Sequence, residues 1–435
     1  MASKIKLLKV LIFVLLQVVV VYLLMGVYRI PAEYQQEQCK AGPAKNVLYM
    51  KIYKTGSTTL QNIFYRYAWN NNLTIVPVFN DPRRFELSNH LVPKKYRKKH
   101  YNNHYNIFPE HIKKFNKSDY STLMPNNTIY IASVRHPMTQ FMSLLKEYHF
   151  IQGRLGLESA DPLDQAEEIL SSKSGKLLDP LLGAPDLLYN QMATQFNLMT
   201  PSGHAKDNMD SVLDEADDIF SLVLLTERFD EGLVLMRRKL CWDQKDIIYV
   251  HLRHRPRAFD DTSLDGYVKE HKKRSAVDYV LYERFKAKME MTIKMQSADF
   301  HDEVANFKRR IKQIGNFCGE VYNTFKTTKS IVYSSKPRLD FDDNQWTSGF
   351  SIDPYKCLLM KTENHVFRNK LLFRQMPINI CQSLVANQIP VASNLVLKRN
   401  RLHCSEYYCD EQDEVKSFKE LFSGNLRHET LLSVK

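Results

Sequence analysis

NVLYMKIYKTGSTTL, the stretch from Asn46 to Leu60, is the most informative part of this chain. Its apolar first half predicts a buried strand, Gly56 marks a turn, and a helix is expected to follow. A strand that passes through a tight turn into a helix gathers backbone N–H groups and the positive end of the helix dipole at one point, which favours an anion. The expected helix has one apolar face, formed by Leu60, Ile63, Phe64 and Tyr67.

The side chains of the turn also suit an anion. Gly56 lets the backbone approach a ligand without a Cβ in the way. Lys54 adds a positive charge, and Ser57, Thr58 and Thr59 add hydroxyl donors. The sequence therefore predicts that a phosphate or sulfate group binds here.

The order of residues separates this turn from the loop of nucleoside triphosphatases. Those loops carry Lys directly after the last Gly and need a Ser or Thr to hold magnesium. Here Lys54 precedes Gly56 and the loop is shorter, so a kinase or ATPase ranks last and no metal is expected. The Lys-Thr-Gly-Ser-Thr order resembles the 5′-phosphosulfate loop of sulfotransferases, whose donor is 3′-phosphoadenosine-5′-phosphosulfate.

A second anion site is predicted further along the chain. Thr128–Val134 is expected to form a strand, Arg135 ends it, and Pro137 suits the first turn of the next helix. Ser143 lies off the apolar face of that helix. A guanidinium and a hydroxyl that converge on one phosphate would bind the 3′-phosphate of such a donor.

Strands and helices alternate along the chain. Phe220–Leu225 is expected to form a strand, and a helix with apolar residues at Phe229, Leu233 and Leu240 follows. This alternation predicts an α/β fold with a mainly parallel sheet covered by helices on both faces. The other expectations are a short strand at 73–78, irregular structure with short helices at 80–118, a surface excursion at 153–174, a long amphipathic helix around 304–318 and weak periodicity from about 330.

The composition fits a folded protein of 435 residues, with 44% apolar and 25% charged residues. The net charge of +13, from 61 basic and 48 acidic residues, raises a nucleic-acid partner as an alternative. The basic residues are spread out and no zinc-finger spacing or RNA-binding signature accompanies them, so no nucleic acid is expected. A basic enzyme that handles a polyanionic nucleotide explains the excess.

The N-terminus predicts a membrane anchor. Residues 10–28 form an apolar run behind Lys4, Lys6 and Lys9, and about 20 apolar residues cross a bilayer. A cleaved signal peptide is the alternative, but the run is long and no clean cleavage site follows it. The expected organisation is a cytoplasmic tail at 1–9, a signal anchor at 10–28, a stem at 29–45 and a lumenal domain at 46–435, whose part from 330 is the least well defined.

Glycosylation sequons at Asn72, Asn116 and Asn126 agree with a lumenal domain. The seven cysteines show no C-x-x-C spacing, which disfavours a metal site. Some of them would pair in an oxidising lumen, and their connectivity stays open.

Beyond these motifs, the chain resembles the galactose 3-O-sulfotransferase family, which includes galactosylceramide sulfotransferase. The resemblance runs to about residue 320. It is carried by segments at 50–63, 106–111, 123–125 and 189–190, and most closely by LVLLTERFDEGLVL at 222–235 with Leu240-Cys241-Trp242.

The resemblance implies a P-loop-like sulfotransferase fold and transfer of sulfate to the 3-hydroxyl of a galactose, on a glycolipid or glycan, at the Golgi membrane. It leaves a homodimer as a candidate oligomeric state. It implies that Arg135 and Ser143 bind the 3′-phosphate of the sulfate donor, and that His111 and Asn190 bind the sugar acceptor. The residues implied to bind the 5′-phosphosulfate of the donor are Lys51, Lys54, Thr55, Gly56, Ser57 and Thr58.

One position departs from the family pattern. Family members commonly have His directly before the loop lysine, where it is taken as the general base, and this chain has Tyr53. A phenol with a pKa of about 10 is a poor base near neutral pH. We therefore place Lys54, His111 and Tyr53 in the catalytic set, with His111 as the first candidate for the base and a structural histidine as the alternative.

Two other functions stay open at this stage. The nucleotide motifs do not separate galactose from a uronic acid or hexosamine of a glycosaminoglycan as the acceptor. Tyr53 also leaves open a lumenal protein that binds the nucleotide but has weakened or lost catalysis.

Overall fold

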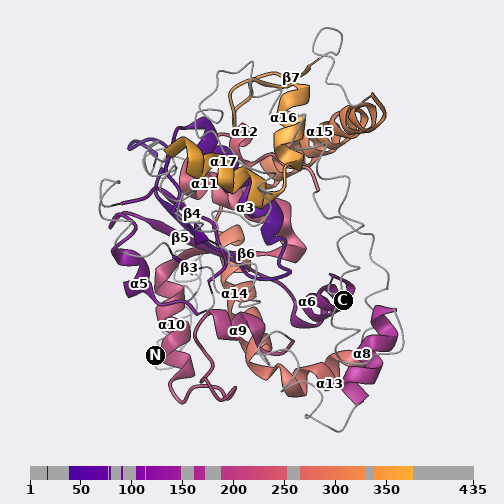
Figure 1. Cartoon of the computed structure of the whole chain (residues 1–435). Coiled ribbons are helices and arrows are strands. Elements are labelled where there is room, and N and C mark those ends of the chain that lie inside the picture. The colour runs from indigo at the N-terminus through magenta and orange to yellow at the C-terminus, as the bar shows by residue number, and fades with distance from the viewer. Residues whose placement is uncertain are drawn as a thin grey trace, which may run out of the picture.

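A four-stranded parallel sheet lies at the centre of the protein (Figure 1). The computed structural model describes residue 17 and residues 39–76, 78–79, 90–91, 104–112, 114–147, 161–171, 188–251, 265–328 and 338–375. The sheet has the order β4-β1-β5-β6, and all three pairings are parallel, which confirms the predicted sheet. Its strands are β4 (Ile107–Phe108), β1 (Val47–Met50), β5 (Ile129–Val134) and β6 (Phe220–Leu225).

The register of the sheet puts the carboxyl ends of its strands at one edge. All four side chains of β1 are fully buried, as expected for a strand covered on both faces. Val47 of β1 lies opposite Ile129 of β5, and Met50 lies opposite Ala132. The turns that follow β1 and β5 therefore begin side by side.

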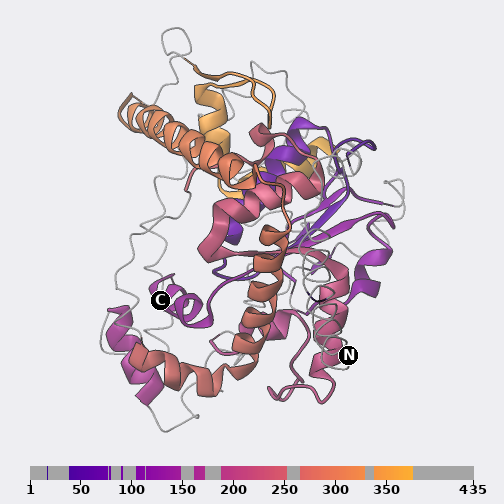
Figure 2. The same cartoon turned by 180° about the vertical axis from the view of Figure 1, so that it is seen from behind.

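Helices cover both faces of the sheet, as predicted. Helices α3 (Ser57–Asn70) and α11 (Phe229–Leu240) lie on one side, and α10 (Met209–Ile219) and α14 (Ala276–Lys294) lie on the other (Figures 1 and 2). Helix α11 packs very closely on β6, because a Cβ on Gly232 would lie only 2.9 Å from Leu224 Cδ2. The predicted boundaries of β6 agree with the structure, and α11 is the helix that was expected after it.

A smaller apolar core forms beside the main one. Helices α6 (Pro137–Glu147), α8 (Pro162–Ser171) and α13 (Asp265–Arg274) surround it. The expectation of a surface excursion at 153–174 is wrong for α8, whose Ala166 and Ile169 are buried in this core. The acidic residues of α8 made its sequence look like that of a surface segment, so its apolar face was not recognised.

Two further expectations need correction. The region 80–118 was expected to be irregular, but it supplies β4, the neighbour of β1. The expected strand at 73–78 is reduced to a single bridge between Ile75 and Ile107, and β2 (Val78–Phe79) pairs instead with β3 (His90–Leu91). These pairings are two residues long or shorter, so periodicity cannot reveal them.

The C-terminal part of the described chain is well structured despite its weak periodicity. Helix α15 (Phe300–Thr328) confirms the predicted amphipathic helix. After it come the hairpin β7 (Leu339–Phe341) and β8 (Phe350–Ile352), then α16 (Pro354–Lys361) and α17 (Asn364–Gln375). The other helices of the described residues are α5 (Lys117–Ser121), α9 (Gln191–Gln195), the 3₁₀ turn η3 (Thr226–Arg228) and α12 (Gln244–Ile247).

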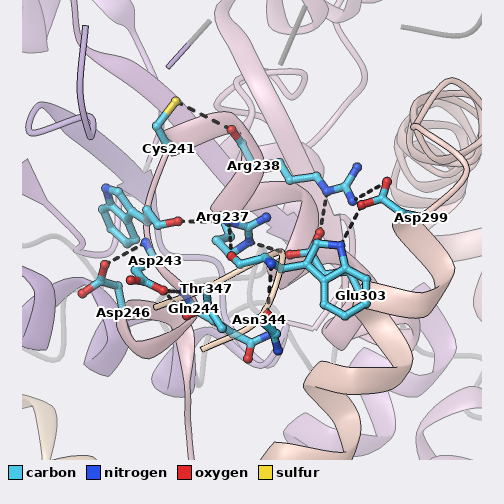
Figure 3. A network of polar contacts seen from close by, with 12 residues as sticks. Arg237, Arg238, Cys241, Asp243, Gln244, Asp246, Asp299, Glu303, Asn344 and Thr347 are labelled. Carbon is cyan, nitrogen blue, oxygen red and sulfur yellow. Dashed lines mark hydrogen bonds and ion pairs between the residues drawn. The ribbon is translucent and has the colours of Figure 1, made fainter. Parts of the chain in front are cut away.

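A buried ionic cluster fixes α11 to α15 (Figure 3). The carboxylate of Glu303, which is fully buried, accepts a hydrogen bond from Nε of Arg238 at 2.6 Å and forms an ion pair with Arg237, whose Nε lies 2.6 Å from its other oxygen. Arg238 also pairs with Asp299, which accepts the indole N–H of Trp346 at 2.7 Å. Removal of one partner would leave buried charge uncompensated, so the cluster favours one relative placement of these elements.

Two disulfides join distant parts of the chain, Cys39 to Cys241 and Cys318 to Cys357. The other three cysteines lie outside the described residues. Within the described residues, no helix combines the length and apolar character that crossing a bilayer requires. The predicted anchor at 10–28 lies outside them except for Gln17.

Candidate active site

The turn between β1 and α3 has an unusual backbone. Lys54 has a φ of 63° and Gly56 a φ of 71°, so both adopt the left-handed conformation. That conformation is uncommon for a residue with a side chain, and such strained positions cluster at functional sites. Gly56 is the N-cap of α3, and a Cβ there would lie 3.2 Å from Phe229 Cε2.

The first turn of α3 is arranged for an anion. It contains no acidic residue. The N–H groups of Thr59 and Leu60 bond to the carbonyl of Gly56, whereas those of Ser57 and Thr58 precede the first intrahelical bonds. The positive end of the helix dipole lies at the same point. Backbone donors, helix dipole and the adjacent Lys54 together fit a phosphate or sulfate.

Two of the predicted donor ligands face the protein interior. Thr55 is fully buried, and its hydroxyl bonds to Ser133 Oγ at 2.7 Å and to the carbonyl of Ile52 at 3.1 Å. Ser57 is only 4% exposed. The side chain of Thr55 therefore stabilises the turn, and its backbone is the part that can contact a ligand.

The second predicted anion site lies against the first. Arg135, directly after β5, donates from Nη1 to the carbonyl of Lys54 at 3.1 Å. Its Nε donates to Thr139 Oγ1 at 3.0 Å, which fixes the plane of the guanidinium. Ser143 is half-buried on α6, two turns beyond the end of β5. The structure thus brings Arg135 against the Lys54 turn at one edge of the sheet, and phosphate binding by Arg135 and Ser143 stays a prediction.

His111 lies at the same edge, after β4. It forms a β-bridge with Lys51, and its Nδ1 lies 2.8 Å from the Lys51 carbonyl. Because a carbonyl only accepts, Nδ1 carries the proton and Nε2 is the unprotonated nitrogen. Burial and the charge of Lys51 lower the pKa of His111 well below its usual 6.5. The imidazole is therefore neutral near pH 7, the form that a general base requires.

Tyr53 and His111 lie face to face. Their rings stack with centroids 3.7 Å apart and planes 11° from parallel. An imidazole thus lies directly beside the position where the family pattern has histidine, although it comes from another strand. The two candidates for the base therefore lie in direct contact, and the choice of His111 as the base stays a prediction.

Buried glutamines, which sequence analysis did not single out, hold this edge together. Gln195 donates to the carbonyls of Lys51 at 3.3 Å and Ile112 at 2.8 Å. Gln140 donates to the carbonyl of Tyr53 at 2.7 Å. Glutamine carries no distinctive sequence signal, so only the long-range contacts reveal these roles.

Asn190, predicted to bind the acceptor, is placed at a helix junction. Its Nδ2 donates to the carbonyl of Arg274, and its Oδ1 accepts the N–H groups of Val277 and Asp278. These bonds join the end of α13 to the start of α14. Both ends of its amide stabilise the fold, and acceptor binding by Asn190 stays a prediction.

The predicted glycosylation sites at Asn72, Asn116 and Asn126 are all exposed, and their modification stays a prediction. In the part of the chain that the structure describes, no group of three or more His, Cys, Asp or Glu side chains is placed to hold a metal ion.

Comparison with known proteins gives one consistent family. A family model described as galactose-3-O-sulfotransferase matches residues 1–332. Mouse galactose-3-O-sulfotransferase 3 is 28% identical over 296 residues, which cover 63% of this chain and 59% of the mouse protein. Human galactose-3-O-sulfotransferase 2 is 25% identical over 285 residues, covering 65% of this chain and 70% of the human protein.

Human galactosylceramide sulfotransferase is 27% identical over 219 residues, which cover 49% of each chain. This chain therefore spans about half to three-fifths of the length of the galactose-3-O-sulfotransferase 3 and galactosylceramide sulfotransferase sequences that it matches.

Proposed function

The chain belongs to the galactose-3-O-sulfotransferase family, and we propose that it transfers sulfate from 3′-phosphoadenosine-5′-phosphosulfate to the 3-hydroxyl of a galactose. The acceptor would be a glycolipid similar to galactosylceramide or a galactose-terminated glycan. The observation that carries this proposal is the contact between Arg135 and the carbonyl of Lys54, which joins two anion sites at neighbouring strand ends. A donor with phosphate groups at both ends of an adenosine needs two such sites close together.

In this proposal the donor supplies an activated sulfate. The N–H groups at the start of α3 and the ammonium of Lys54 bind its phosphosulfate and stabilise the negative charge that grows there during transfer. Arg135 and Ser143 bind its 3′-phosphate. These groups carry the positive charge that magnesium supplies in nucleoside triphosphatases. Most of the rate gain then comes from positioning and electrostatics.

His111 is the proposed general base. Its Nε2 would accept the proton of the galactose hydroxyl as that oxygen attacks sulfur, while the bond from sulfur to the 5′-phosphate oxygen breaks and adenosine 3′,5′-bisphosphate leaves. The bond from Nδ1 to the Lys51 carbonyl sets the tautomer, and the stacked Tyr53 ring limits rotation of the imidazole. Tyr53 is thus proposed to orient the base and His111 to act as the base.

The proposed location is the Golgi membrane, with a type II anchor at residues 10–28 and the catalytic part in the lumen. The two disulfides support this location, because such bonds persist in oxidising compartments and are rare in the cytosol. The exposed sequons agree with it. A homodimer remains the candidate oligomeric state.

The test is sulfate transfer by the purified full-length chain in detergent, with radiolabelled donor. Galactosylceramide, a lactose-type glycan and heparan sulfate precursor are the acceptors compared. Transfer to the galactosides with loss of activity in His111→Ala, but not in Tyr53→Phe, is the expected result. Transfer to the heparan sulfate precursor alone would show that the acceptor is a glycosaminoglycan sugar and not galactose. Binding of the donor without transfer to any of the three acceptors would refute the proposed reaction.

A further inference from the structure

Helix α17 begins beside the first turn of α3. The Nδ2 of Asn364, its first residue, donates to the carbonyl of Thr58 at 2.9 Å and to Oε1 of Gln61 at 2.6 Å. Among the described residues, Asn364 Oδ1 is buried and has no hydrogen-bond partner. Burial of the unpaired oxygen costs free energy, which the two hydrogen bonds from Nδ2 offset, so the amide is held at the start of the anion-binding helix by those two bonds.

Gln61 connects this amide to Lys51. Its Oε1 also accepts a hydrogen bond from Nζ of Lys51 at 2.6 Å, and its Nε2 donates one to Tyr65 OH at 3.2 Å. Lys51 Nζ and Asn364 Nδ2 are both donors, so together they fix Oε1 on their side and Nε2 on the side of Tyr65. The position of the Lys51 ammonium therefore depends on an amide whose orientation Asn364 helps to set.

The rest of α17 is attached along α3, so that Asn364 cannot move away easily. Arg368 pairs with buried Glu110, the residue before His111, at 3.6 Å. Arg374 donates to the carbonyls of Ala68 and Trp69 at the other end of α3. The start of α17 is thus fixed against the anion-binding turn by bonds made elsewhere on the helix.

Residues 338–375 lie beyond the segment that matches the family model, which ends at 332. We propose that Asn364 is a positioning residue of the donor site, which fixes Gln61 and through it holds Lys51 at the carboxyl end of β1. This inference rests on the proposed function, because it takes the anion bound at this edge to be the sulfate donor. It assigns part of the donor site to the C-terminal segment.

The test is the affinity of the full-length chain for 3′-phosphoadenosine 5′-phosphate, measured by calorimetry, together with the KM for the sulfated donor and kcat. Asn364→Leu removes the hydrogen bond to Gln61, the residue that holds the Lys51 ammonium, so the nucleotide should bind about tenfold more weakly. Gln61→Met should weaken binding similarly, and the double variant should be no weaker than either, since both act on Lys51. Asn364→Asp keeps the shape but loses the donor, and should weaken binding at least as much.

Asn306→Leu is the matched control. Asn306 lies on α15, and its Oδ1 is likewise buried without a partner among the described residues. This variant should keep the wild-type affinity. Arg374→Met tests general loosening of α17, and it should lower the unfolding temperature while leaving affinity within about twofold of wild type.

Wild-type affinity in both Asn364 variants would overturn the inference, as would equal weakening in Arg374→Met. A wild-type chain that does not bind the nucleotide would refute the proposed donor and this inference together. The wild-type titration therefore separates the two failures.

Discussion

Replacement of Gly56 by alanine tests the geometry of the anion-binding turn. Gly56 has a φ of 71° and a ψ of 7°, and the left-handed conformation costs a residue with a Cβ roughly 1–2 kcal/mol. The added methyl would also lie 3.2 Å from Cε2 and 3.5 Å from Cδ2 of Phe229, at the start of α11. Both effects act in the same direction, so the free energy of unfolding of Gly56→Ala should fall by about 2 kcal/mol.

The assay is urea unfolding of the full-length chain, followed by fluorescence, with nucleotide affinity measured by calorimetry. The affinity should fall as well, because relief of strain moves the N–H groups of Ser57 and Thr58. Gly315→Ala is the matched control, since Gly315 lies within α15 with nothing inside 4 Å of an added Cβ. It should stabilise the protein by about 0.5–1 kcal/mol.

A second variant separates the two causes. Gly56→Ala in a Phe229→Leu background removes the ring contact but leaves the backbone strain, so relative to Phe229→Leu alone the loss of stability should shrink to the part that the strain causes. A Gly56→Ala protein as stable as wild type, with unchanged nucleotide affinity, would refute the left-handed turn and the anion site built on it.

Four further predictions concern the loop lysine, His111 and Gly232. Lys54→Ala should lower kcat at least about a hundredfold with the fold intact, and near-normal turnover would remove its role. Because its pKa is lowered, His111 stays neutral as the pH falls, so kcat/KM should stay level from pH 7 to below 6.5. A decrease of kcat/KM with its midpoint at or above pH 6.5 would contradict the assignment of His111 as the base. Below about pH 6.5 the imidazole of His111 takes up a proton in the unfolded chain but not in the folded chain. The free energy of unfolding should therefore decrease as the pH is lowered through this range, and it should decrease less in His111→Gln. Gly232→Ala should cost about 1–3 kcal/mol in urea unfolding, because its methyl meets Leu224 at 2.9 Å, and an unchanged midpoint would show that β6 can yield.

Local patterns predicted the parts of the fold that are long and regular. β6, α11 and α15 were predicted because their apolar residues repeat with the period of a strand or a helix over six residues or more. β4 has only two residues and exists through its pairing with β1, which no local pattern reveals. α17 went unpredicted because it packs on α3, a partner more than 300 residues away in sequence.

The residues of the candidate site also fall into those whose roles the sequence predicts and those whose roles it does not. Lys54, Gly56 and Arg135 follow strands that the sequence shows clearly, so their convergence could be predicted. The roles of Thr55 and Asn190 within the fold could not, because a hydroxyl or amide in sequence does not indicate whether it faces a ligand or the interior. The stacking of His111 on Tyr53 depends on the register between β1 and β4, which only the structure gives.

The disulfide between Cys39 and Cys241 lies where the chain comes in from its amino-terminal segment. Within a few residues of it, the carbonyl of Ala44 accepts the indole N–H of Trp242, and the N–H of Ala44 bonds to Leu240. Mechanical tension on the amino-terminal segment therefore passes through a covalent bond into the end of α11 before it reaches β1. Part of any force that reaches Cys39 is therefore carried by α11, and the strand that leads to Lys54 bears less of it. A shortened form of the protein that starts after residue 39 loses this covalent link and leaves Cys241 without its disulfide partner.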